Sequence, residues 1–198
     1  MVRLQPAGSR ILLALGLTAV ASAAQAGFFP TTLSGNTTGA SDSIFVGAPD
    51  DNFLGIGGQI VTYDFGLQTV VNRPGLVDFN VYEVDFGAVE FTSMTVSISN
   101  DGVTFTPVDA SAVALVRITG DSVHSSNSFG RSYDLGAFST VRYIRIDGDG
   151  SGAAGGTNGF DLDAIGAHEV TAVPEPETYA LLLAGLGVVG LVARRRRG

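Results

Sequence analysis

The chain has 198 residues, of which 27 are glycine, and it contains no cysteine and no tryptophan. This length suits one domain of ordinary size with short segments at its ends. So much glycine disfavours a helical bundle and favours a turn-rich all-β protein. The lack of cysteine excludes disulfides and thiol chemistry.

Basic residues gather at the two ends of the chain, so the middle is more acidic than the formal charge of -8 suggests. Residues 27–173 contain five arginines, no lysine and seventeen acidic residues, a formal charge of -12. Nucleic acids and anionic lipids are bound through Lys and Arg side chains that neutralise phosphate. We therefore expect cations as partners of the middle segment, and no nucleic acid.

Residues 1–26 have the pattern of a signal peptide. Arg3 and Arg10 precede an apolar run at 11–21, and Ala24 and Ala26 supply the small residues that signal peptidase requires before Gly27. The alternative, a membrane-spanning or buried helix, fits less well because the run is too short to cross a bilayer. The sequence therefore predicts export, with signal peptidase as a partner.

Short alternating runs separated by turn residues predict an antiparallel β-sandwich over residues 44–171, after a flexible leader at 27–43. The Asp101-Gly102 turn predicts a hairpin between 92–99 and 103–108. Residues 141–146 and 160–169 are predicted as late strands, with Asp161 and Asp163 on the face opposite Leu162. No segment of useful length has a helical period.

The C-terminal segment, 172–198, combines a proline-rich stretch, an apolar run and a basic end. Pro174 and Pro176 prevent a continued strand or helix, so we expect an exposed, extended hinge. The apolar run 179–193 would form a helix of about 22 Å, shorter than the roughly 30 Å hydrocarbon core. The positive-inside rule would keep the basic end in the cytoplasm, and this end consists of Arg194, Arg195, Arg196 and Arg197.

In order and spacing, these features resemble a PEP-CTERM sorting signal. The resemblance implies that Pro174, Glu175 and Pro176 are recognised by an exosortase, a membrane-embedded cysteine protease or transpeptidase of bacteria that make exopolysaccharide. The chain would be held transiently in the inner membrane and then reach the cell surface, the outer envelope or the extracellular matrix. The alternative is a plain C-terminal membrane anchor that nothing processes.

Several pieces of the middle segment, taken in order, are similar to galactose-binding-like jelly-roll surface domains. They are residues 47–50, 63–66, 81–83, 97–102, 143–146 and 159–164. The resemblance covers roughly residues 47–169 and implies a binding function more often than catalysis, although a fold does not settle the ligand.

Carboxylates alternate with glycine in residues 147–152, as the oxygen ligands of a calcium ion would. Asp147, Asp149 and Ser151 match the first positions of an EF-hand loop, but residue 158 is Asn where the loop needs Glu, so no EF-hand is predicted. Similar jelly rolls often bind a structural calcium near the meeting point of the chain ends, which adds Asp50 and Glu169 as candidate ligands. The alternative is a solvated acidic loop whose Asp and Gly residues form turns.

These patterns predict a non-catalytic structural or adhesive protein of the surface or exopolysaccharide matrix. The alternative is a calcium-supported carbohydrate-binding module. An aromatic sugar platform is disfavoured because Trp is absent and the tyrosines are expected to fill the core; the four are Tyr63, Tyr82, Tyr133 and Tyr143. His124 and His168 lie in no catalytic motif, so no enzyme is expected, and a glycosidase, which needs two carboxylates, is the enzyme alternative.

Overall fold

The computed structural model describes residues 27–84, 90–110, 116–117, 128–151, 158–172 and 183–186. The predicted signal peptide, most of the C-terminal segment and His124 lie outside these residues. The described strands are β1 (Thr32–Asn36), β2 (Leu54–Gly55), β3 (Ile60–Asp64), β4 (Gln68–Val71), β5 (Phe79–Val84), β6 (Met94–Ser99), β7 (Thr106–Val108), β8 (Val116–Arg117), β9 (Ser128–Tyr133), β10 (Thr140–Val141), β11 (Tyr143–Gly148), β12 (Asp161–Ala167) and β13 (Val170–Ala172). A short 3-10 helix, η1 (Asp42–Ile44), follows β1, and residues 183–186 are helical.

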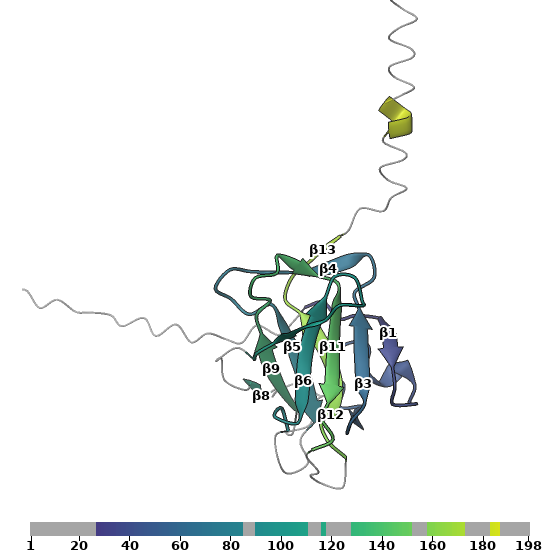
Figure 1. The fold of residues 1–198 in the computed structure, drawn as a ribbon, viewed down its shortest axis with the longest axis vertical. Coiled ribbons are helices and arrows are strands. Elements are labelled where there is room, and N and C mark those ends of the chain that lie inside the picture. Colours follow the sequence, from purple (N-terminus) through teal and green to yellow (C-terminus); the bar gives the residue numbers. More distant parts are fainter. Residues whose placement is uncertain are drawn as a thin grey trace, which may run out of the picture.

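The strands form two five-stranded sheets and a smaller third sheet. The first sheet has the order β1-β3-β11-β6-β7, the second β2-β12-β5-β9-β8, and the third β10-β4-β13. Every described strand pair is antiparallel. The two large sheets lie face to face (Figure 1), and their inner residues form one core cluster. The predicted all-β antiparallel sandwich is therefore confirmed.

The core forms from apolar side chains on the inner faces of the two large sheets, and β11 shows how alternation along a strand buries them. In β11, Ile144 and Ile146 are fully buried, whereas the alternate positions are partly exposed. Ile144 lies in register with Tyr63 of β3 and Ile98 of β6, both also buried. The predicted hairpin is present as well, since β6 pairs with β7 and Ile98 lies opposite Thr106.

Residues 27–43 depart from the expected flexible leader. Thr32–Asn36 forms β1 at the edge of the first sheet, and the Thr32 hydroxyl donates a hydrogen bond to the Asp64 carbonyl at 3.0 Å. Leu33 packs against the core. Residues 32–36 show no alternating pattern because an edge strand needs backbone pairing along one side and few buried side chains.

The sandwich has two different ends. The tail end carries the third sheet and the turns at 65–67, 72–78 and 100–104, because β3 and β6 finish where β11 begins. The acidic end lies opposite, where β11 finishes at Gly148, and includes residues 90–93 and 147–151. In Figure 1, β13 and β4 lie at the top of the sandwich and the arrowhead of β11 points to the bottom.

Candidate functional site

The predicted calcium residues Asp147, Asp149 and Ser151 lie together at the acidic end. Asp147 is near the end of β11, and the Asp149 backbone N–H donates to the Ser93 carbonyl at 2.9 Å. The Ser151 backbone N–H donates to Asp149 Oδ1 at 2.7 Å. Hydrogen bonds from the Ser151 side chain and backbone lower the pKa of the exposed Asp149. Local hydrogen bonds thus hold Asp149 as a carboxylate within a turn.

The other two candidate calcium ligands, Asp50 and Glu169, lie apart from each other. Asp50 lies beside β12, where its backbone N–H faces Asp163. Glu169 lies at the tail end, and its carbonyl accepts a hydrogen bond from the Val71 N–H of β4. The described part of the chain contains no group of three or more His, Cys, Asp or Glu side chains that could hold a metal ion. Because residues 152–157 lie outside the described part, calcium binding at this loop stays a prediction.

Asp163 is a buried carboxylate of β12, in the strand that the sequence predicted with Asp163 and Leu162 on opposite faces. Its side chain is 2% exposed and accepts the backbone N–H groups of Asp50 at 3.4 Å and Asp51 at 3.1 Å. Burial, with a smaller contribution from the carboxylates of Asp50 and Asp51, raises the pKa of Asp163 to about 7 against the two hydrogen bonds, which lower it. Asp51 has φ 64°, an unusual conformation for a residue other than glycine. Asp163 therefore holds the turn at Asp50 and Asp51 through two backbone hydrogen bonds.

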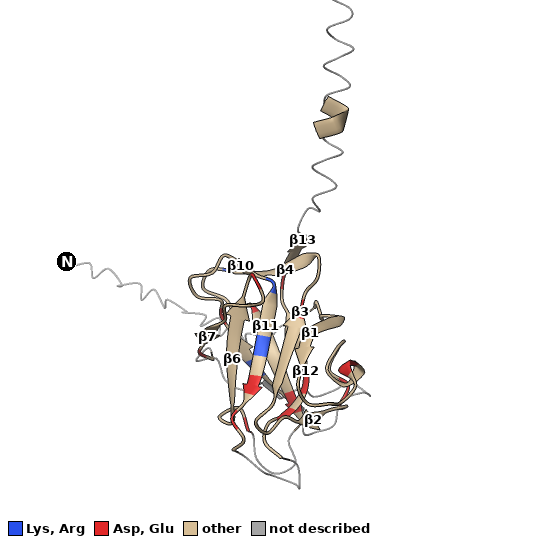
Figure 2. Cartoon of the chain, turned by 45° about the vertical axis from the view of Figure 1, so that its right-hand side comes forward, with Lys and Arg blue, Asp and Glu red and all other residues tan. Residues whose placement is uncertain are grey.

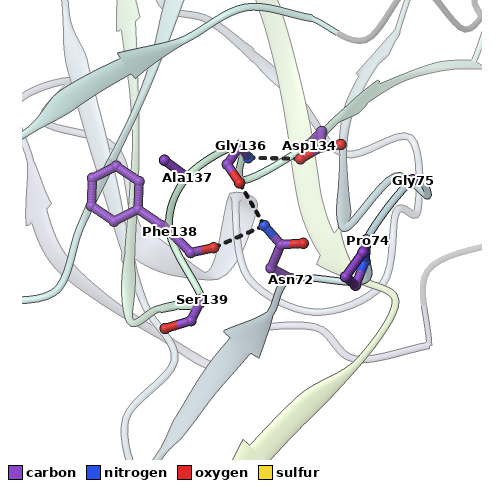
Figure 3. A pocket seen from close by; sticks show the side chains of 8 residues that line it. All are labelled: Asn72, Pro74, Gly75, Asp134, Gly136, Ala137, Phe138 and Ser139. Atoms are coloured by element: carbon purple, nitrogen blue, oxygen red, sulfur yellow. Dashed lines mark hydrogen bonds between the residues drawn. The ribbon is translucent and has the colours of Figure 1, made fainter.

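A pocket opens at the tail end of the sandwich (Figure 3). Its volume is about 450 Å³, within the range of small-ligand sites, which is roughly 300–1,000 Å³. Two chain segments form its walls, and the lining residues are Asn72, Pro74, Gly75, Asp134, Gly136, Ala137, Phe138 and Ser139. Its side-chain polar groups come from Asn72, Asp134 and Ser139, which suits a ligand with several hydroxyl groups.

Asn72 links the two walls of the pocket. Its side-chain amide donates to the carbonyls of Gly136 at 2.8 Å and Phe138 at 2.9 Å, as Figure 3 shows. The Asn72 backbone N–H also donates to the Ser139 carbonyl at 2.9 Å. In the second wall, Asp134 Oδ1 accepts from the Gly136 N–H at 2.6 Å. The pocket is therefore shaped by hydrogen bonds between its own lining residues.

A second carboxylate, Asp78, fastens both walls from inside the domain. Asp78 is fully buried and accepts the backbone N–H groups of Arg73 at 2.7 Å and Leu135 at 2.9 Å. Burial raises its pKa, although these hydrogen bonds and the nearby Arg73 oppose the change. The sequence offered no signal for this role, because the two donors lie 5 and 57 residues away from Asp78.

His168 lies next to this anchor. Its backbone N–H donates to the Asp78 carbonyl at 2.8 Å, and its ring Nε2 is buried without a hydrogen-bond partner. Burial, and then the charge of Arg73, lowers the pKa of His168, so the ring is neutral at pH 7. His168 lies at the start of the turn before β13, and these contacts indicate a structural role.

The tyrosines offer little aromatic surface for a sugar. Tyr63, Tyr82 and Tyr133 are at most 3% exposed, and Tyr143 is partly exposed under the Arg142 guanidinium. The prediction that these residues fill the core is confirmed for Tyr63 and Tyr133, whereas Tyr82 is buried in a separate small cluster with Ala164 and Phe29.

The chain is similar, at low sequence identity, to solved structures that contain CBM32 domains. CBM32-1 from a family 31 glycoside hydrolase of Clostridium perfringens is 13% identical, with a TM-score of 0.45 over 71% of this chain and 96% of that chain. A truncated AlyQ with CBM32 and alginate lyase domains is 19% identical, with a TM-score of 0.40 over 75% of this chain and 34% of that chain. At this similarity the matches assign neither a ligand nor an activity to the chain. No curated protein matches it in sequence.

The C-terminal segment is described at residues 183–186. No helix among the described residues is both long and apolar enough to cross a bilayer. Residues 172–197 match the family model of the PEP-CTERM protein-sorting motif, which starts at Ala172, the last residue of β13. The chain therefore carries a C-terminal PEP-CTERM sorting signal, which indicates an exported protein that is sorted to the cell envelope.

Proposed function

We propose that this protein is a structural or adhesive component of the cell surface or of the exopolysaccharide matrix. The observation that carries the proposal is the position of the sorting motif, which follows a folded β-sandwich without any intervening domain. With this arrangement, the β-sandwich is the part of the chain that sorting presents outside the cytoplasm.

The sorting signal would act in two steps. The apolar run at 179–193 first holds the chain in the inner membrane, with the four arginines in the cytoplasm. An exosortase then recognises Pro174, Glu175 and Pro176 and removes the part that follows. The short span supports temporary retention, because a helix of about 22 Å matches a core of roughly 30 Å poorly.

Substitution of the motif tests this proposal in the native host. In a Pro174→Ala, Glu175→Ala, Pro176→Ala variant, the unprocessed chain should accumulate in the membrane fraction. A matched control, Glu177→Ala with Thr178→Ala, changes the adjacent residues and should be processed like the parent. Equal processing of the parent and the motif variant would contradict recognition of these three residues.

A second candidate function is carbohydrate binding in the tail-end pocket. The pocket supports it through its volume of about 450 Å³ and the polar side chains of Asn72, Asp134 and Ser139. These groups accept hydrogen bonds from sugar hydroxyls, and no aromatic platform is needed for such contacts.

Calorimetric titration with the host's exopolysaccharide tests the second candidate. An Asp134→Asn, Ser139→Ala variant should lose measurable binding, because two of the polar side chains change. A matched control, Asp101→Asn, alters an exposed carboxylate in another turn of the same end and should bind like the parent. Absence of binding by the folded parent chain would rule out this function.

A further inference from the structure

We propose that the tail end of the sandwich rests on the membrane surface before processing, with apolar side chains of its turns inserted among uncharged lipids. This inference rests on the proposed membrane-held stage of the sorting pathway. The partner is the bilayer itself, through its zwitterionic headgroup layer.

The large exposed apolar side chains of the described sandwich all lie at the tail end. Leu67 follows β3 and precedes β4, Leu76 lies between β4 and β5, and Val103 lies between β6 and β7. Phe28 forms a bridge with Ala167, the last residue of β12. The exposed fractions are 44% for Phe28, 59% for Leu67, 60% for Leu76 and 82% for Val103. Isolated exposed apolar residues are common, whereas exposed apolar side chains that gather in one region mark interaction sites. Among the described residues of the sandwich, these four lie at the end from which the sorting segment leaves.

The chain itself brings this end to the membrane. Ala172 pairs with Gln68, so Leu67 lies beside the point where the sorting segment leaves the sandwich. Six residues, 173–178, separate Ala172 from the apolar run. Even fully extended they span only about 20 Å. While the apolar run is inserted, the tail end must therefore stay close to the bilayer.

The distribution of charge supports the same orientation. Asp147 and Asp149 lie at the acidic end, and Figure 2 shows red segments at the end where β11 finishes. At the tail end, Arg142 is bound to Asp64 through two hydrogen bonds of 2.7 and 3.0 Å, which neutralises both groups. Exposed Asp101 and Glu169 leave this end without a basic surplus. An anionic bilayer would therefore repel it, whereas a zwitterionic bilayer would accept its apolar turns.

The absence of tryptophan makes a direct test possible. Single-tryptophan variants of the mature chain, residues 27–198, are made at Leu67→Trp, Leu76→Trp and Val103→Trp. The matched control is Ser151→Trp, at an exposed position of the acidic end. Each variant is reconstituted into phosphatidylcholine vesicles, with and without bromine on the acyl chains, and an unchanged melting temperature verifies its fold.

Brominated acyl chains should quench the three tail-end variants, and their emission should shift to shorter wavelength, while Ser151→Trp is unaffected. Adding anionic phosphatidylglycerol should reduce the quenching. Quenching of the three tail-end variants that is no stronger than quenching of the Ser151→Trp control would overturn the proposal. The lipid vesicles contain no exosortase, so this result is independent of whether the tail is processed in the host.

Discussion

Replacing Asp163 with asparagine should flatten the pH dependence of the domain's unfolding free energy between about pH 4 and pH 7. In the folded chain, burial raises the pKa of this carboxyl from 3.8 to about 7. The folded state therefore binds a proton more tightly than the unfolded state in this range. The stabilisation is fully present below the unfolded pKa and is lost as the pH rises through the folded pKa.

The magnitude follows from the difference between the two pKa values. They differ by about three pH units, and each unit corresponds to ~1.4 kcal/mol. The parent chain should thus lose about 4 kcal/mol of unfolding free energy between pH 4 and pH 7 from this group alone. Asparagine cannot ionise, so the variant lacks this loss even if its stability at pH 4 is lower.

Urea denaturation of the mature chain in mild detergent, followed at several pH values, measures this difference. The control is Asp101→Asn, because hydrogen bonds from Thr104 and Val103 hold the pKa of Asp101 at about 2, outside the range. Its pH profile between 4 and 7 should match that of the parent. If the Asp163→Asn profile has the same slope as the parent profile, the buried carboxyl is not the group that titrates, and the reasoning fails.

Three further substitutions test how the sandwich is held together, each by thermal or urea unfolding. Gly148→Ala should prevent folding or cost more than about 3 kcal/mol, because the added Cβ would collide with the Ile56 carbonyl. Its control is Gly35→Ala, whose Cβ meets only ordinary contacts and which should change stability by less than about 1 kcal/mol. Asp78→Ala should cost about 2–4 kcal/mol by leaving two buried N–H groups without an acceptor, and a cost below ~1 kcal/mol would refute its anchoring role. Arg142→Ala should cost about 1 kcal/mol or less, because its ion pair is partly exposed, and a much larger loss would show that the pair is not screened by solvent.

Part of the fold could be predicted from local patterns in the sequence. Ile144 and Ile146 face the core between partly exposed neighbours, so the hydrophobic period of two identified their strand directly. The β6–β7 hairpin followed from the local turn at Asp101 and Gly102, where Gly102 has φ 71°. In both cases the information is local in sequence.

The features that sequence reasoning missed depend on contacts between distant residues. The alternation of Asp163 with Leu162 indicated a face for Asp163, but not that the backbone of Asp50 and Asp51, more than 100 residues earlier, donates hydrogen bonds to it. Strand β1 has little apolar character and exists through its pairing with β3. The walls of the pocket likewise meet through Asn72 and residues 64 and 66 positions away. No local pattern contains such information.

The sorting segment could be predicted well because its function depends on order and composition alone. Two prolines, an apolar run and a basic end predict an extended chain, membrane insertion and an orientation without reference to tertiary contacts, and residues 172–197 match the sorting-motif family model. The ligand of a domain depends on the three-dimensional arrangement of its side chains, which is why the sequence left that question open.

The intact mass of the mature protein, purified from the native host, tests the central claim most directly. Removal of residues 1–26 and processing of the tail predict a mass for a chain that begins at Gly27 and lacks residues 179–198. A mass that includes Arg194 to Arg197 would contradict processing and identify the segment as a permanent anchor.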